Sequence, residues 1–188
     1  MHSENLPLGR LRRVFRISAV GFFGAFVFGV FAYVALRSGF SYLFGKDISP
    51  FAAPPRMFLY HWQYWYQYLA IVALVYGLLL PLWVNFHPRS GKAAYWVGLT
   101  AFLALTILLA SIPGGILWQI HDMMAGFWPH ESIIRRKIWR GAIDGLFLGW
   151  WVVTLSFPLN LITFIFSAAL THKITAREVE PRETRVNC

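Results

Sequence analysis

Four histidines lie beside long apolar stretches of this sequence, where they could bind the iron of a haem group: His61, His87, His121 and His172. If the stretches cross a membrane, His61 and His121 fall near one surface and His87 and His172 near the other. Two pairs of axial ligands at two depths are what a b-type cytochrome with two haems needs. All four, however, lie at the ends of the stretches, where a histidine is also an ordinary polar residue at the water boundary. We therefore expect no cofactor and keep haem b as the alternative.

A second group of residues could hold a metal ion near one surface: His121, Asp122, His130 and Glu131. Imidazole and carboxylate ligands suit zinc or manganese. Their spacing matches no metal-binding motif, and Pro129 interrupts any single helix that would carry all four. The sequence also lacks the phosphate-loop, dinucleotide-binding, zinc-protease and nucleophile-elbow motifs. We predict no metal site and no catalytic residue; an enzyme that uses this group at the membrane surface is a third hypothesis.

The elements that would position these residues are four long stretches without Asp, Glu, Lys or Arg: residues 17–36, 57–88, 93–121 and 145–172. A helix needs about 20 mainly apolar residues to cross the hydrocarbon layer of a bilayer. The sequence therefore predicts an all-α, polytopic membrane protein with a single domain and four transmembrane helices. These helices are expected near 15–37, 64–86, 94–112 and 146–171, between polar tails at 1–13 and 174–188, the second of them disordered.

Aromatic rings crowd the start of the second stretch, which reads YHWQYWYQYLA from Tyr60 to Ala70. On a helix these rings would point in all directions, whereas a ligand cage would gather them on one side. Trp and Tyr collect at the headgroup level of a bilayer, because each joins an apolar ring to a polar tip. We interpret the stretch as an aromatic belt at the membrane surface, with a bound quinone or lipid headgroup as the alternative.

Residues 114–144 lie between the third and fourth expected spans. Within them, ESIIRRKIWRGAIDG places Ile134, Ile138 and Ala142 on one stripe of a helix. The rest of that helix carries a basic group: Arg135, Arg136, Lys137 and Arg140. This pattern predicts an amphipathic segment that lies in the membrane interface, and an acidic partner protein is the alternative occupant.

Another topology would let residues 116–128 cross back through the membrane as a separate span. That return leg would be short and would carry Gln119, His121 and Asp122 into the bilayer. A buried Asp alone disfavours insertion by about 2.5–3.5 kcal/mol. We therefore expect an interfacial or shallow re-entrant segment between the third and fourth spans.

Small residues recur every four positions in the first expected span, at Gly21, Ala25 and Gly29. This spacing opens a groove along one face of a helix and lets a second backbone approach closely. The pattern predicts a tight contact between helices, either with another span of the same chain or with another subunit.

Charge counting gives an orientation. Ten Lys and Arg residues flank the side of the expected bundle that holds both termini, against seven on the other side. Because Lys and Arg accumulate in cytoplasmic loops, both termini are expected in the cytoplasm. The net charge of +9 resides at the ends of apolar stretches, where it meets lipid headgroups. We therefore expect no nucleic-acid partner.

Together these features predict a multi-pass protein of the bacterial inner (cytoplasmic) membrane. Its expected partners are the lipid bilayer and other membrane protein subunits, within a secretion, conjugation or energy-transducing complex. In that assembly the chain would be a non-catalytic subunit or an accessory factor. The alternative is a haem b- or quinone-binding membrane anchor of an oxidoreductase.

Overall fold

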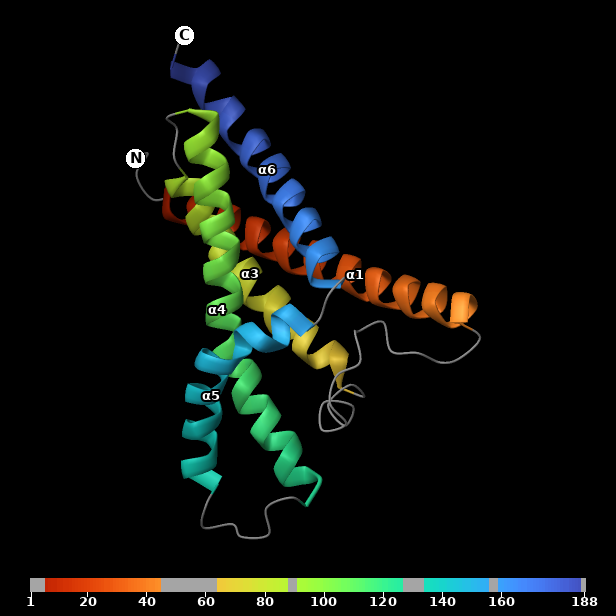
Figure 1. Cartoon of the computed structure of the whole chain (residues 1–188). Coiled ribbons are helices and arrows are strands. Elements are labelled where there is room, and N and C mark those ends of the chain that lie inside the picture. The colour runs from red at the N-terminus through yellow and green to blue at the C-terminus, as the bar shows by residue number, and fades with distance from the viewer. Residues whose placement is uncertain (1–5, 45–63, 88–90, 127–133, 156–158, 187–188) are drawn as a thin grey trace.

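The computed structural model describes residues 6–44, 64–87, 91–126, 134–155 and 159–186, and the regular elements in these ranges are all α-helices (Figure 1). They are α1 (Leu6–Phe44), α3 (Trp65–Phe86), α4 (Lys92–Met124), α5 (Ile134–Leu155) and α6 (Leu159–Val186). Among the described residues, four helical segments are long and apolar enough to cross a membrane: Leu8–Gly39, Trp65–Phe86, Lys92–Met124 and Leu159–Glu178. For the described residues, the prediction of an all-helical chain with four such helices is confirmed.

Several helix boundaries differ from those expected. α1 extends beyond the expected span 15–37 at both ends and includes much of the expected polar tail 1–13. α4 does not end near residue 112 but continues through Pro113 to Met124, so that the first part of segment 114–144 extends the third apolar helix. Proline removes one hydrogen bond from a helix, yet packing by a neighbouring helix makes it tolerable in apolar surroundings. The expected fourth span, 146–171, is divided between α5 and α6, and Pro158 falls among the three residues between them, outside the described ranges.

The C-terminal region also differs from expectation. α6 continues to Val186, through most of the region expected to be a disordered polar tail. Glu178 lies in this part of α6 and forms ion pairs with Arg13 and Arg16 of α1. The polar end of α6 is therefore attached to the polar start of α1.

The core lies where α1, α3 and α4 meet. Residues of α6 pack against this core. Its buried side chains are Ile17, Tyr76, Leu80, Trp83, Val84, Leu99 and Leu103. The Tyr76 hydroxyl is 2.7 Å from Thr171 Oγ1, which joins α3 to α6 inside this core. A buried polar atom needs such a partner, because water cannot reach it.

Glycines allow α1 to lie close to its neighbours. A Cβ at Gly21 would come within 2.7 Å of Leu80 of α3, and one at Gly29 within 2.5 Å of Leu69. Ala25, between them, packs against the core. The small-residue groove predicted at Gly21, Ala25 and Gly29 is thus occupied by α3 of the same chain.

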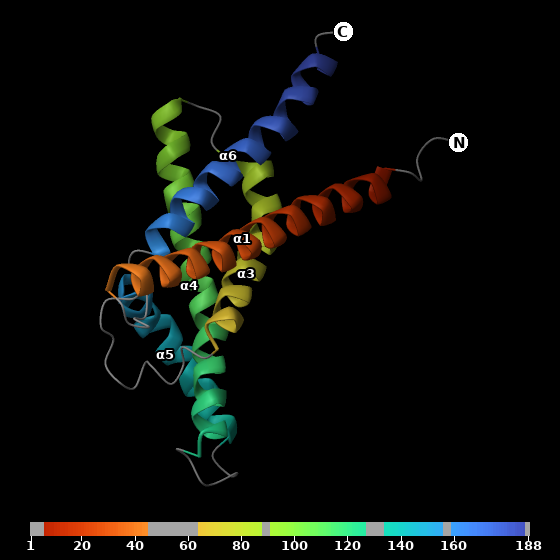
Figure 2. The same ribbon diagram turned by 90° about the vertical axis from the view of Figure 1, so that its right-hand side faces the viewer.

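A second glycine contact joins α4 to α5. A Cβ at Gly115 would collide with the Gly141 carbonyl oxygen and would lie 2.6 Å from Gly145 Cα. A Cβ at Gly145 would likewise collide with the Ser111 carbonyl oxygen. The two backbones therefore touch directly, and the first part of α5 with the C-terminal part of α4 forms a hairpin that extends away from α1 and α6 (Figures 1 and 2).

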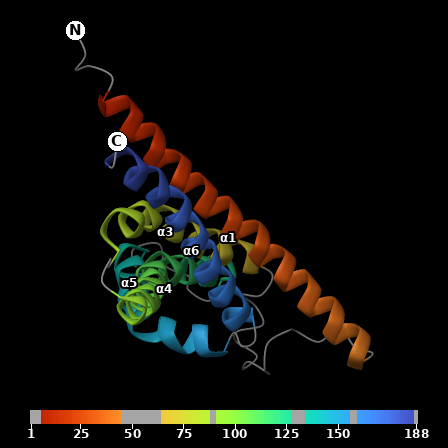
Figure 3. The same cartoon turned by 90° about the horizontal axis from the view of Figure 1, so that it is seen from above.

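The helices are not all parallel. Figure 3 shows α1 along its length, with α6 beside it, whereas α4 is seen nearly end-on. α1 and α4 therefore cross each other. α1 is held against the rest of the structure by its contacts with α3 and α6.

Candidate functional site

One polar cluster surrounds His121, near the C-terminal end of α4. This residue is only 2% exposed. Its Nε2 lies 2.9 Å from Oε1 of Gln67, its Nδ1 lies 3.1 Å from the Tyr68 hydroxyl, and its ring stacks on that of Tyr64 at 3.9 Å between centroids. The stretch interpreted as an aromatic belt thus supplies three of the residues that surround a buried histidine.

These contacts use both nitrogens of the ring. An amide oxygen only accepts hydrogen bonds, so that Nε2 of His121 donates to Gln67. Nδ1 forms the other hydrogen bond, with the Tyr68 hydroxyl. Coordination of iron through either nitrogen would require one of these bonds to break.

Charged residues lie next to this cluster. Trp118 forms a hydrogen bond with the Asp122 carboxylate, and Lys137 of α5 is close enough to Asp122 to interact with it electrostatically. His130 and Glu131, which the sequence grouped with His121 and Asp122 as a possible metal site, lie outside the described residues. Within the described ranges no group of three or more His, Cys, Asp or Glu residues could hold a metal ion.

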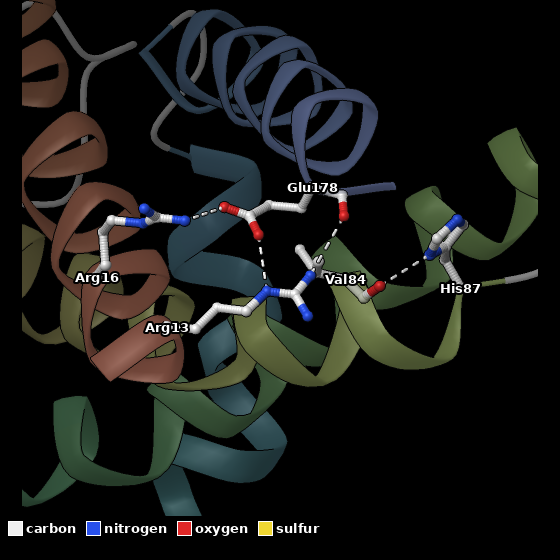
Figure 4. Close-up of polar contacts among 5 residues, drawn as sticks. All are labelled: Arg13, Arg16, Val84, His87 and Glu178. Carbon is white, nitrogen blue, oxygen red and sulfur yellow. Dashed lines mark hydrogen bonds and ion pairs between the residues drawn. The ribbon is translucent and has the colours of Figure 1, made fainter. Parts of the chain in front are cut away.

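A second cluster lies at the opposite end of α3. Nδ1 of His87 is 3.2 Å from the Val84 carbonyl oxygen one turn earlier (Figure 4). Its ring centroid is 5.9 Å from that of Tyr95 on α4, whose hydroxyl is 3.2 Å from Nδ1 of His172 on α6. His87 and His172, one of the two pairs expected for haem, therefore both contact Tyr95. His61, a member of the other expected pair, lies outside the described residues.

The contact between α1 and α6 is an ion cluster that sequence reasoning missed. Arg13 Nε is 2.7 Å from Oε2 of Glu178 and Arg16 Nη2 is 2.6 Å from Oε1, while Arg13 also donates to the Glu178 carbonyl oxygen at 3.4 Å (Figure 4). The Glu178 side chain is only 17% exposed, so its charge depends on these partners. No local signal could pair residues this far apart in the chain.

The basic group of α5 occupies the start of that helix. Arg140 lies 3.6 Å from Asp144 one turn later, and its side chain is 72% exposed. Lys137 lies one turn before Arg140, whereas the side chains of Arg135 and Arg136 are not among those that the structure describes. The exposed pair contributes little stability, because water screens it.

Removing the Glu178 charge should loosen the contact between α1 and α6. We expect Glu178→Gln to lower the free energy of unfolding in detergent by about 1 kcal/mol. A half-buried ion pair stabilises a protein only slightly more than an exposed ion pair does. Arg13→Gln should have a similar effect and Arg16→Gln a smaller one, because the Arg16 side chain is 67% exposed. Unfolding curves followed by circular dichroism would measure this order, and an equal loss for Arg13 and Arg16 would contradict it.

No protein-family model, curated protein or solved structure matches this chain. Its function is therefore inferred from its own residues and geometry.

Proposed function

We propose that this chain is a multi-pass protein of the bacterial cytoplasmic membrane and serves there as a non-catalytic subunit or accessory factor of a larger membrane assembly. One observation carries the proposal of membrane insertion. Large apolar side chains cover the outward faces of the long helices, among them Phe23 and Phe31 of α1 and Leu74, Leu78 and Leu82 of α3. An apolar surface this extensive needs an apolar solvent.

The helix lengths support the same proposal. At about 1.5 Å per residue, the 22 residues of α3 extend about 33 Å, close to the thickness of the hydrocarbon layer. The 32-residue segment of α1 and the 33 residues of α4 extend about 48–50 Å. A helix that exceeds the layer thickness can cross it at a tilt, which is compatible with the crossing of α1 and α4.

The polar contacts support a structural role for the chain. His121 joins α3 to α4, Tyr76 joins α3 to α6, and Glu178 joins α6 to α1. In each case the partners come from different helices, as in a bundle that polar side chains hold together. Residues of this kind can stabilise a subunit without taking part in chemistry.

Membrane insertion has a direct test. We expect the expressed protein to sediment with membranes, to remain there in alkaline carbonate and to be released only by detergent, because its apolar surfaces contact lipid chains. Co-purification from mild detergent followed by mass spectrometry should then identify fellow subunits. A folded monomer in the supernatant without detergent would refute insertion, and a monodisperse monomer without companions would refute the subunit role.

Orientation is a separate prediction. The contact of Arg13 and Arg16 with Glu178 holds the start of α1 beside the end of α6, as expected if both termini lie on one side of the membrane. We expect reporter domains fused to either terminus to be cytoplasmic, because Lys and Arg favour that side. A fluorescent protein that requires the cytoplasm and a phosphatase that requires the periplasm would measure this. Opposite locations of the two termini would contradict it.

A haem b- or quinone-binding anchor is the second candidate. It is favoured by the approach of His87 and His172, from different helices, to Tyr95. The purified protein should then show a Soret band that His87→Ala abolishes and His130→Ala leaves intact. A haem-free spectrum after expression with added haem precursor would exclude the cytochrome form.

A further inference from the structure

The outward face of α5 carries three large apolar side chains in a row. Trp139 is 65% exposed, Ile143 53% and Phe147 71%. Residues four positions apart lie on one face of a helix, so that these three form a continuous outer stripe. This stripe differs from the one that the sequence predicted, because Ile138 and Ala142 are only partly exposed.

The opposite face of α5 prevents the outer stripe from turning inward. Gly141 and Gly145 are buried against Ser111 and Gly115 of α4, where no side chain would fit. Rotation of α5 about its axis would drive larger side chains into this backbone contact. The outer stripe therefore stays exposed in the isolated chain and requires another covering.

The polarity of this face changes along the helix. The Arg140 side chain is 72% exposed at the start of this face. Trp139, with an apolar ring and a polar N–H, lies at the same level. Ile143 and Phe147 follow one and two turns later, and the only charge in residues 141–155 is Asp144, the partner of Arg140. Charge, then an indole ring, then alkyl and phenyl groups is the order found from the headgroups of a bilayer to its acyl chains.

We propose that the outer stripe of α5 binds anionic lipid. Arg140 contacts a phosphate group, Trp139 lies at the level of the headgroups, and Ile143 and Phe147 pack against acyl chains. This inference rests on the proposed membrane insertion and specifies how α5 takes part in it. An acidic protein would complement Arg140 but would gain nothing from the apolar end of the stripe.

The lone cysteine of the chain makes a site-specific test practicable. Cys188→Ser provides a cysteine-free background, into which Trp139→Cys, Ile143→Cys and Phe147→Cys are introduced one at a time and labelled with a nitroxide. The labelled proteins are reconstituted into vesicles of phosphatidylcholine and phosphatidylglycerol. Collision rates with oxygen and with a water-soluble nickel chelate then report depth. We expect depth to increase from residue 139 through 143 to 147.

A label at Leu78, on the outward face of α3, distinguishes lipid binding by the outer stripe from membrane insertion of the whole chain. Collisions with the nickel chelate at 143 and 147, together with a lipid-exposed label at 78, would overturn the lipid-binding stripe and leave membrane insertion intact. Protection of 143 and 147 from both reagents would mean that a second copy or another protein covers the stripe, which also overturns the proposal. A water-exposed label at 78 would refute the insertion itself.

The charge at Arg140 is tested independently. Native mass spectrometry of the detergent-solubilised protein, titrated with phosphatidylglycerol, gives a binding constant for each successive lipid. We expect Arg140→Gln to weaken the tightest of these constants by about fivefold, the contribution of one basic residue at an anionic surface. Arg140→Lys should restore it, since the charge is retained. Unchanged binding in Arg140→Gln would show that the phosphate contact is absent.

Discussion

Gly115→Ala is expected to destabilise the protein strongly, while Gly114→Ala at the adjacent position is not. We expect the first variant to lose about 1–3 kcal/mol or more of its free energy of unfolding, the range for an overpacked contact. The second should change by less than about 1 kcal/mol, in the stabilising direction, because alanine favours the helix more than glycine does.

The contrast follows from what a single methyl group would meet. At Gly115 it collides with the Gly141 carbonyl oxygen and lies 2.8 Å from the Gly145 nitrogen, both of which are backbone atoms of α5. Backbone cannot rotate aside as a flexible side chain can, so the two helices must separate. At Gly114 an added Cβ meets nothing within 4 Å. The two variants are otherwise the same change in consecutive residues of one helix.

Titration of the purified protein from mild detergent into a denaturing detergent would measure both unfolding free energies by circular dichroism. Separation of the helices in Gly115→Ala should also increase proteolysis of the hairpin formed by α4 and α5. Equal stability of the two variants would mean that α4 and α5 do not touch through their glycines. The argument that the outer stripe of α5 faces away from α4 would then be wrong as well, because it depends on that glycine contact.

His121→Ala is expected to have the second large effect, a loss of about 2–4 kcal/mol. The substitution removes a ring that is 2% exposed and leaves a cavity between α3 and α4. It also breaks the hydrogen bonds of the ring with Gln67 Oε1 and the Tyr68 hydroxyl. Each such bond contributes about 0.5–1.5 kcal/mol to stability.

Two comparisons distinguish the lost hydrogen bonds from the lost volume. His172→Ala, at an exposed position, should change stability by less than about 0.5 kcal/mol. The double variant Gln67→Leu, His121→Leu should lose less than the sum of its single variants, because two apolar groups replace a bonded pair. Strict additivity in the same unfolding assay would argue against a direct bond between Gln67 and His121.

The polar contacts show where local sequence reasoning ends. His121 was assigned to the water boundary because it lies at the end of an apolar stretch, yet Gln67, Tyr64 and Tyr68 of α3 enclose it. Glu178 lies in a region expected to be disordered, yet two arginines from the other end of the chain hold it. Burial and ion pairing of this kind depend on a second helix whose position the nearby residues do not reveal.

Long stretches without charge were enough to predict that this chain forms long apolar helices, because about 20 consecutive apolar residues are typical of a helix that can cross a membrane. The spacing of Gly21, Ala25 and Gly29 likewise predicts a close contact between two helices. Only the tertiary structure decided that α3 fills that contact, that α4 continues past Pro113 and that α5 turns Trp139 and Phe147 outward. The reason is physical: helix formation is a local property of the backbone, whereas the choice of which face to bury is made by the neighbour against which that face packs.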